Sequence, residues 1–329
     1  MKAAVVGGAG YIGSFTSHAL RDAGWDVVII DDLSSGHKEA VAGLRLEKID
    51  VVKQERELAI LFETEKFDAV FHFAALIQME ESMKDPALYF RHNIGGSINV
   101  LEAARTGGAK RFIFSSTAGV YGNPQKLPIP EEHPKNPTNP YGESKVMVER
   151  TLAWYFKIFG ISSVSIRYFN AAGASLDGKT GEDHPKESHL MPRIIRSVLR
   201  NEEITVFGND YETRDGTCIR DYVHVLDLAT AHIKALEYLE GREGTFAFNT
   251  GTGQGHSNLE VIKMVEQVSG KKVQYSIGPR REGDAANLVA DPTKAQKELG
   301  WKPRFSDLET IVKSAWAWHR KNPNGYSSV

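Results

Sequence analysis

Tyr141 and Lys145 form a Tyr-x-x-x-Lys pattern in the segment that begins at Asn139. Residues four apart share one face of a helix, and an ammonium group beside a phenol favours the ionised form of the phenol. Tyr141 is therefore a candidate proton acceptor near neutral pH, and the pair points to hydride chemistry. A surface helix can carry the same two residues incidentally, so other segments must support this interpretation.

A glycine-rich turn near the start of the chain gives that support. The segment 7–13, Gly-Gly-Ala-Gly-Tyr-Ile-Gly, follows a predicted strand and opens a helix predicted for 15–23. Its glycines permit a tight turn and bring backbone close to a pyrophosphate, which the helix N-terminus favours. Asp31 ends the second predicted strand, where its carboxylate can accept hydrogen bonds from ribose hydroxyls and would repel a 2'-phosphate; Asp32 shares that role or is solvated. The turn predicts NAD rather than NADP, with a flexible glycine loop as the alternative.

Short apolar runs separated by helical stretches indicate how these residues are positioned. The runs are rich in Val, Ile and Phe without strict alternation, which is typical of strands covered on both faces in a parallel sheet. We expect an α/β fold with a doubly wound parallel (Rossmann) sheet and right-handed connections. The predicted strands are Ala3–Val6, Val27–Ile30, Leu44–Ile49, Ala69–Phe73, Phe112–Phe114 and Val164–Ile166.

The pattern changes after about Asn170 and predicts a smaller α/β C-terminal substrate lobe. Such a lobe would close over the carboxyl ends of the strands, where doubly wound folds bind ligands. We expect a NAD-binding domain over 1–170 and a substrate-binding lobe over 171–329, with segments such as 217–250 as candidates for a return to the Rossmann sheet. Helices are predicted for 191–200, 259–268 and 308–318, and a strand for 222–225.

Composition argues against several classes of function. A net charge of -2 gives no electrostatic reason to expect a nucleic acid or an anionic membrane as partner. Cys218 is the single cysteine, which excludes an internal disulfide framework and fits a reducing compartment. The N-terminal run reads as a strand rather than a signal peptide, and no apolar run approaches the roughly 18 residues of a membrane helix. We therefore expect a cytoplasmic protein.

The segment Ser115-Ser116-Thr117 follows a predicted strand and places hydroxyl groups at its carboxyl end. By itself such a segment is more often a turn or a cap. With the glycine turn, Asp31 and the Tyr-x-x-x-Lys pattern, it completes a hydroxyl, phenol and ammonium set that resembles the extended short-chain dehydrogenase/reductase superfamily.

A narrower resemblance rests on blocks that span nearly the whole chain. In order and spacing they are similar to those of UDP-glucose 4-epimerases, and the stretch 207–225 is the more specific part. The resemblance implies an NAD-dependent isomerase that interconverts UDP-galactose and UDP-glucose, with a UDP-sugar as its small-molecule partner. The blocks are 71–75, 115–122, 139–142, 167–170, 207–211, 215–217, 220–225 and 280–284.

The resemblance also implies two sets of binding residues. Arg220 and Arg281 have a separate physical argument, because planar guanidinium groups make bidentate contacts to a diphosphate; the alternative is a surface salt bridge. The NAD set is Gly7, Gly10, Tyr11, Ile12, Gly13, Asp31, Asp32, Ser35, Gly36, Asp50, Val51, Phe73, Ala74, Ala75, Asn93, Ser115, Tyr141, Lys145 and Tyr168. The UDP-sugar set is Thr117, Tyr141, Asn170, His189, Leu190, Thr205, Phe207, Arg220, Arg281 and Asp284.

The resemblance implies a catalytic role for Tyr141, Lys145 and Thr117. On this hypothesis, Lys145 and the positive nicotinamide ring keep Tyr141 as a phenolate, which removes the proton of the sugar 4'-hydroxyl through Thr117. Hydride passes from C4' to NAD, the ketose turns its other face, and hydride returns with inverted configuration.

Four positions depart from the pattern of many relatives. Thr117 stands where Ser is common, Ile77 where Lys often contacts the cofactor, and His189 where Asn contacts the nucleotide. Leu288 falls where relatives differ between Tyr and smaller residues, which leaves open a 4-epimerase of UDP-N-acetylhexosamines. These departures bear on substrate scope more than on the type of reaction.

Other activities are weighed against this one. A 4,6-dehydratase needs an acid and a base directly after the Thr, whereas Ala118 and Gly119 offer no proton-transfer group. A 4-epimerase or decarboxylase acting on UDP-glucuronate stays open. A non-catalytic NAD-binding protein is disfavoured because such proteins often lose the Tyr or the Lys, and both are present here.

No metal is expected from the sequence. His184 and His189 lie near Asp183 and Glu187 without a ligand spacing that is typical of a metal site, and a solvated charged segment is the simpler interpretation.

The resemblance further implies a homodimer. Relatives commonly pair through two helices, here expected over 87–104 and 141–159, with Trp154 and Ile158 as apolar contacts. The alternative is that this apolar stripe faces the protein's own sheet.

Overall fold

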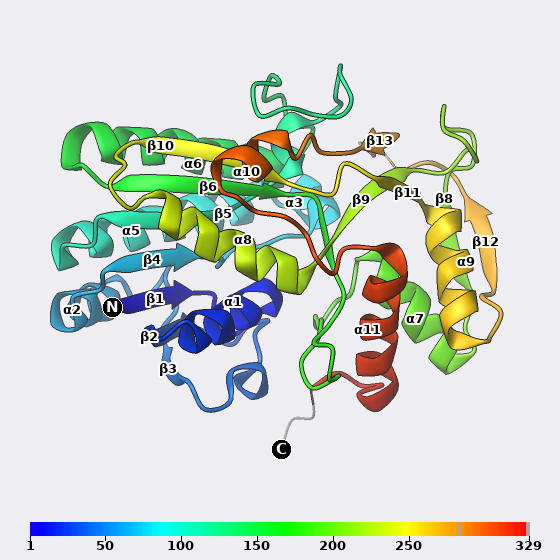
Figure 1. Cartoon of the computed structure of the whole chain (residues 1–329), viewed down its shortest axis with the longest axis horizontal. Helices are drawn as coiled ribbons and strands as arrows, with labels where there is room; N and C mark the ends of the chain where they lie inside the picture. Colours follow the sequence, from blue (N-terminus) through cyan, green and yellow to red (C-terminus); the bar gives the residue numbers. More distant parts are fainter. Residues whose placement is uncertain (282–283, 327–329) are drawn as a thin grey trace.

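The computed structural model describes residues 1–281 and 284–326. Figure 1 shows a central sheet covered by helices on both faces, with a smaller group of helices and short strands beside it. Among the described residues, none of the helices combines the length and the apolar character that crossing a bilayer requires.

The central sheet contains seven parallel strands in the order β10-β6-β5-β4-β1-β2-β3. The chain builds outward from β1 in one direction and then from β4 in the other, so the strand order reverses between β1 and β4. Ligands bind at such a reversal, outside the carboxyl ends of the strands. The strands are β1 (Lys2–Val6), β2 (Asp26–Asp31), β3 (Arg45–Lys48), β4 (Ala69–His72), β5 (Arg111–Thr117), β6 (Ser162–Tyr168) and β10 (Thr245–Thr250).

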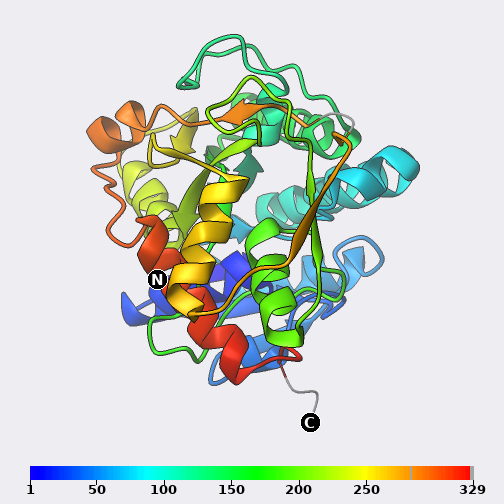
Figure 2. The same cartoon turned by 90° about the vertical axis from the view of Figure 1, so that its right-hand side faces the viewer.

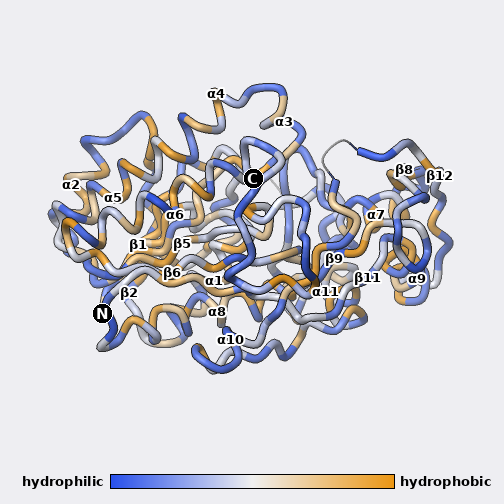
Figure 3. Tube along the Cα trace, turned by 90° about the horizontal axis from the view of Figure 1, so that it is seen from above, coloured by the Kyte–Doolittle hydropathy of each residue, from blue (hydrophilic) through white to orange (hydrophobic). Residues whose placement is uncertain are grey.

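The alternation of side chains along β1 explains its continuous apolar sequence. Ala3 and Val5 belong to a core with α1 and α8 on one face of the sheet, while Ala4 and Val6 belong to a core with α2, α5 and α6 on the other. A strand buried on both faces needs apolar residues at every position. In Figure 3 the apolar trace accordingly gathers inside the molecule. The covering helices are α1 (Tyr11–Asp22), α2 (Glu55–Glu65), α5 (Gly96–Gly107), α6 (Pro140–Phe159) and α8 (Val225–Tyr238).

The smaller lobe contains three helices that enclose a core of their own. Figure 2 shows them at the front, beside the short strands. The predicted doubly wound sheet with a smaller α/β lobe is thus confirmed. The helices are α7 (Leu190–Arg200), α9 (Asn258–Ser269) and α11 (Leu308–Lys321), and the strands are β7 (Asn170–Ala172), β8 (Ile204–Phe207), β9 (Ile219–His224), β11 (Gly255–Ser257), β12 (Tyr275–Gly278) and β13 (Asn287–Leu288).

The segment 217–250 divides between the two parts. Its first strand, β9, pairs with β7, β11 and β13, whereas α8 packs on α1 and β10 pairs with β6 at the edge of the central sheet. The strand predicted for 222–225 is observed as β9, which begins earlier, at Ile219. It ends one residue sooner, at His224, because Val225 is the first residue of α8. Short helices complete the chain: α3 (Met79–Lys84), α4 (Pro86–Tyr89), the π-helix η2 (Phe90–Gly95), the 3-10 turns η1 (Lys38–Val41) and η3 (Ala118–Tyr121), and α10 (Thr293–Glu298).

Candidate active site

A cleft of about 400 Å³ runs along the carboxyl ends of the central strands and continues to the smaller lobe. It brings together most of the residues that the sequence singled out. These are Gly7, Gly10, Tyr11, Ile12, Gly13, Asp31, Asp32, Ser35, Asp50, Val51, Phe73, Ala74, Ala75, Ser115, Thr117, Tyr141, Tyr168, Asn170, His189, Arg220 and Asp284. The remaining ones lie outside its lining: Gly36, Asn93, Lys145, Leu190, Thr205, Phe207 and Arg281.

The glycine turn between β1 and α1 is shaped by two close backbone contacts. Gly7 has a φ of +76°, and a Cβ there would lie 2.4 Å from the Ala74 backbone nitrogen. A Cβ on Gly13 would lie 2.2 Å from the Gly7 carbonyl oxygen. Among the described residues no side chain caps α1 at Gly10, and its first turn has no acidic residue. The amides of this helix end are therefore suited to an anion such as a pyrophosphate.

Asp31 and Asp32 differ in what they bind. The Asp31 carboxylate accepts hydrogen bonds from the backbone amides of Ala9 and Leu33, both at 2.9 Å, and burial raises its pKa despite these bonds. Each oxygen keeps a second lone pair for a ribose hydroxyl. Asp32 instead accepts from the amide and hydroxyl of Ser34 at 2.9 and 2.6 Å. Asp31 is thus fixed at the turn, and Asp32 shapes the loop that follows.

Thr117 and Tyr141 reach the cleft from the end of β5 and the start of α6. Asn139 caps α6 by accepting a hydrogen bond from the Gly142 amide at 2.9 Å, which fixes the first turn that carries Tyr141. Thr117 accepts from the Gly119 amide at 3.0 Å, and its hydroxyl lies close enough to the Tyr141 phenol to lower the pKa of that phenol. The two hydroxyl groups predicted to share a proton are therefore neighbours.

Lys145 lies one turn further along α6, behind the cleft. Its Nζ donates to the Ser115 carbonyl oxygen at 2.9 Å and lies 5.9 Å from the centre of the Tyr141 ring. Burial lowers the pKa of Lys145 to about 7 and raises that of Tyr141 far above its ordinary value, against the smaller effect of Thr117. In the protein's own groups both side chains are buried and the Lys145 ammonium donates to a carbonyl oxygen. That Lys145 and a nicotinamide ring together keep Tyr141 ionised stays a prediction.

The buried Lys145 predicts a pH-dependent stability. Its pKa is about 7 in the folded protein against 10.5 ordinarily, so between these values the unfolded chain binds the extra proton. The free energy of unfolding must then rise with pH over this window, by up to about 1.4 kcal/mol per pH unit. Lys145→Met removes this dependence. Urea unfolding at about pH 7 and about pH 9 should show wild type gaining stability relative to K145M, and an unchanged difference would contradict it.

Asn93 holds the site together from outside the cleft. Its side-chain amide accepts from the Leu76 amide at 2.8 Å and donates to the Leu76 carbonyl and the Ser144 hydroxyl, both at 3.0 Å. It thereby ties the loop after β4 to α6, next to Tyr141. Asn93 lies in the π-helix η2, a local distortion that is frequent at functional sites.

Arg220 and Asp284 line the cleft where the smaller lobe meets it. The Arg220 guanidinium donates to the carbonyl oxygens of Ile219 and Ala285 at 2.9 and 2.8 Å and lies 3.5 Å from the Asp284 carboxylate. These contacts hold the guanidinium in place, and its other N–H groups remain able to donate to a ligand. Arg281 instead lies over the Phe207 ring, 4.2 Å from its centre, and is exposed. Glu282 and Gly283 of the same predicted block lie outside the described residues.

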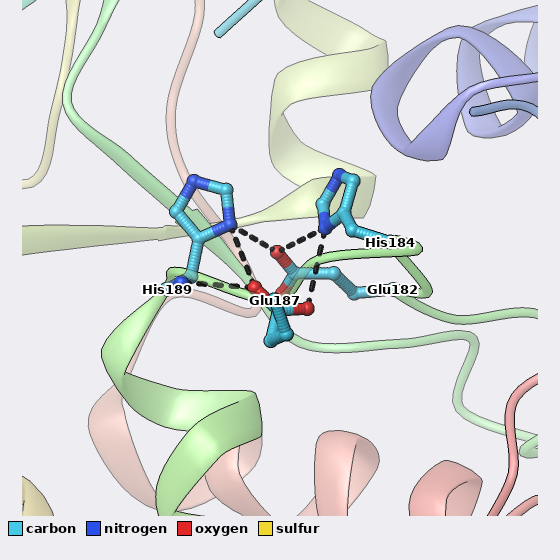
Figure 4. A group of neighbouring side chains, drawn as sticks. All are labelled: Glu182, His184, Glu187 and His189. Atoms are coloured by element: carbon cyan, nitrogen blue, oxygen red, sulfur yellow. Dashed lines mark hydrogen bonds and ion pairs between the residues drawn. The ribbon is translucent and has the colours of Figure 1, made fainter. Parts of the chain in front are cut away.

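The loop before α7 contains a cluster that the sequence analysis missed. Figure 4 shows Glu182, His184, Glu187 and His189 turned toward one another. The interpretation of this loop as a solvated charged segment is wrong, because both glutamate side chains are only 5% exposed. Burial would lower the pKa of His189, but the two carboxylates outweigh it and raise the pKa to about 10. The missed residue, Glu182, could have been suspected from the density of His and Glu in this short stretch.

Other residues of the cleft wall were not singled out for binding. Gln78 donates through its side chain to the Lys186 carbonyl at 3.1 Å, which joins the loop after β4 to the loop before α7. Leu288 and Ile77 also line the cleft, at the two positions noted for their departure from the family pattern.

Comparisons with known proteins identify the family of this chain. The NAD dependent epimerase/dehydratase family matches residues 3–251. The UDP-glucose 4-epimerase of Lacticaseibacillus casei is 46% identical over 99% of both chains, and that of Bacillus subtilis (strain 168) is 42% identical over 100% of both.

Solved structures resemble this one throughout. UDP-glucose 4-epimerase from Brucella ovis in complex with NAD has a TM-score of 0.92 at 43% identity, covering 96% of this chain and 97% of the other. The enzyme from Bifidobacterium longum in complex with NAD+ and UDP has a TM-score of 0.94 at 37% identity, covering 99% and 100%. The chain therefore belongs to the NAD dependent epimerase/dehydratase family, and within it to the UDP-glucose 4-epimerases.

Proposed function

We propose that this protein interconverts UDP-galactose and UDP-glucose by transient oxidation and reduction at C4', with tightly bound NAD. The observation that carries the proposal is the continuity of the cleft. It contains the glycine turn and Asp31 at one end, Thr117 and Tyr141 in the middle and Arg220 at the other end. Relatives named UDP-glucose 4-epimerase along the full chain support the same reaction.

The residues at the glycine turn fit NAD. The uncapped end of α1 suits the pyrophosphate, and the buried Asp31 carboxylate suits the adenosine ribose and disfavours a 2'-phosphate. When bound, NAD supplies the acceptor, and later the donor, of the hydride at C4'. We assign this role to residues 1–170 together with β10, which pairs with β6 at the edge of their sheet, and α8, which packs on α1. We assign UDP-sugar binding to the rest of 171–329.

Tyr141 and Thr117 move the proton in this mechanism. Tyr141, as a phenolate, takes the proton of the sugar 4'-hydroxyl, directly or through the neighbouring Thr117 hydroxyl, and the resulting phenol returns the proton when the sugar hydroxyl forms again. Burial opposes the phenolate, so a positive charge in the cleft is needed to lower the pKa of Tyr141. An oxidised nicotinamide ring provides such a charge, while Lys145 fixes the end of β5 from behind.

Arg220 anchors the other end of the substrate. Its guanidinium is oriented by two backbone carbonyls, so it can contact a diphosphate without losing much conformational entropy. Binding at the diphosphate leaves the distant pyranose free to turn over between oxidation and reduction. Remote binding energy thus retains the intermediate during its rotation.

The direct test is incubation of the purified protein with UDP-galactose without added NAD, followed by identification of the sugar. We expect UDP-glucose to form. UDP-N-acetylglucosamine and UDP-glucuronate should be assayed in parallel, since Leu288 lies in the cleft wall. Conversion of either alternative sugar without conversion of UDP-galactose would overturn the proposal, as would NAD binding with no turnover.

We also propose that the protein acts as a homodimer in the cytoplasm. Trp154 and Ile158 on α6 have side chains that are 58% and 62% exposed, and Ile98 on α5 and Met147 on α6 are each 38% exposed. This exposure supports the dimer interpretation of the stripe over one in which the stripe faces the protein's own sheet. Free, buried Cys218 is consistent with a reducing compartment.

The dimer proposal predicts a loss of association in Trp154→Glu. A charge at the centre of an apolar interface stays costly unless it is paired, so the variant should run as a monomer. Light scattering coupled to size-exclusion chromatography measures the mass. Lys263→Glu, at an exposed position of α9 in the smaller lobe, is the control for a change of charge alone. A wild-type protein that is monomeric at micromolar concentration would exclude the proposal.

A further inference from the structure

The loop between β7 and α7 brings together two imidazoles and two carboxylates, here called the His/Glu cluster: Glu182, His184, Glu187 and His189. One ligand-type atom from each residue lies within 4.8 Å of the others. Figure 4 shows the Nδ1 atom of each imidazole turned toward the carboxylates and the second ring nitrogen turned away. Four possible metal ligands, from within the eight consecutive residues 182–189, are thus directed toward a common centre.

The spacing of these atoms is close to that of a tetrahedral metal site. Glu182 Oε1 lies 3.5 Å from His184 Nδ1 and 2.8 Å from His189 Nδ1. Glu187 Oε2 lies 3.2 Å from His184 Nδ1, and Glu187 Oε1 lies 3.2 Å from His189 Nδ1. Ligands bound to Zn²⁺ at about 2.0 to 2.2 Å in a tetrahedron are separated by about 3.4 Å. The four separations between these nitrogen and oxygen atoms, from 2.8 to 3.5 Å, lie on both sides of this value.

Burial makes the cluster costly without a cation. The side chains of Glu182 and Glu187 are 5% exposed and that of His184 is 16% exposed. Among residues 1–281 and 284–326, the two carboxylates form ion pairs with these imidazoles alone and with no Lys or Arg. One divalent cation would balance both carboxylates and leave both imidazoles neutral, which is the form that binds metals.

The competing arrangement is a pair of ion pairs with protonated imidazoles. Its shortest contact, between Glu182 Oε1 and His189 Nδ1, has the length of a hydrogen bond. Within the described part of the chain, however, both of these atoms are buried without a hydrogen-bond partner, whereas His184 Nδ1 and Glu187 Oε2 form a hydrogen bond at 3.2 Å. A buried polar atom without a partner is expensive, and a cation between Glu182 Oε1 and His189 Nδ1 would satisfy both.

We propose that the His/Glu cluster is a structural Zn²⁺ site. Four protein ligands close the coordination shell, so the ion holds the loop rather than activating water. The loop lies against the NAD end of the cleft: Tyr11 donates to the Gly173 carbonyl oxygen at 2.6 Å, and its ring lies edge-on to that of His184 at 6.5 Å. The ion would thereby fix the first turn of α7 relative to the start of α1.

The test is the zinc content of the full chain, purified without a metal-affinity tag. The protein is dialysed against EDTA, reloaded with ZnCl₂, desalted and analysed by mass spectrometry of the metal. Wild type should retain about one Zn²⁺ per chain, and His184→Gln and Glu182→Gln should bind it about 100-fold more weakly or not at all. His256→Gln, which removes a half-buried imidazole elsewhere, is the matched control and should retain the ion.

Two further measurements use wild type alone, so they test the proposal even if a variant fails to fold. Co²⁺ added to zinc-depleted wild type should give the intense visible bands of a tetrahedral site, and Zn²⁺ should raise the midpoint of thermal unfolding of wild type. Wild type that retains no zinc, or variants that retain it as well as wild type, would overturn the proposal. Metal content does not depend on the epimerase reaction, so the two proposals fail separately.

Discussion

Tyr141→Phe is expected to lower kcat for UDP-galactose by about 1000-fold, because positioned proton transfer contributes about 10² to 10⁴ to rate. The substitution removes one oxygen and leaves the ring in its buried position, so NAD content should not change. Initial rates and the NAD content of the purified protein measure both effects.

Tyr155→Phe is the matched control for this experiment. Tyr155 lies on the same helix, but its hydroxyl donates to the Glu102 carboxylate at 2.7 Å, away from the cleft. The same chemical change there should cost stability by about 1 kcal/mol and leave kcat unaltered. Near-normal turnover in Y141F would remove Tyr141 from the mechanism and with it the proposed proton path.

The second large effect is expected from Gly13→Ala. The new methyl group would lie 2.2 Å from the Gly7 carbonyl oxygen and 2.9 Å from the Gly8 Cα, and both contacts are with backbone. The backbone of the turn must therefore move, because a change of side-chain rotamer cannot relieve these contacts. We expect affinity for NAD to fall by about 100-fold, which is the upper range for overpacking, and turnover to fall with it. Calorimetric titration with NAD measures the affinity.

Gly95→Ala is the control, because it makes the same change where there is room. No described atom lies within 4 Å of a Cβ built at Gly95, and its backbone is helical. This variant should bind NAD as wild type does and should be more stable by up to about 1 kcal/mol. If G13A retains full affinity for NAD, the glycine turn does not bind the pyrophosphate.

The sequence alone determined the central sheet and the two ends of the cleft. The runs Ala3–Val6 in β1 and Val27–Ile30 in β2 are continuously apolar because both faces of the sheet are covered, and this local pattern is visible without a structure. The glycine turn and Asp31 follow those strands directly, so their placement depends only on neighbours in the chain. The sequence could also predict that Thr117 and Tyr141 act together, because Thr117 lies at the end of a strand and Tyr141 at the start of a helix.

Tertiary structure decided the features that depend on distant segments. Whether Lys145 faced the phenol or a carbonyl depended on β5, which runs beneath α6, and burial then set the pKa of both groups. The edge strand β10 was visible only as a candidate because its single partner, β6, is far away in sequence. Glu182 joined His184 only when the loop folded back on itself. Sequence fixes what a side chain can do, whereas burial and partners brought by the fold decide what it does.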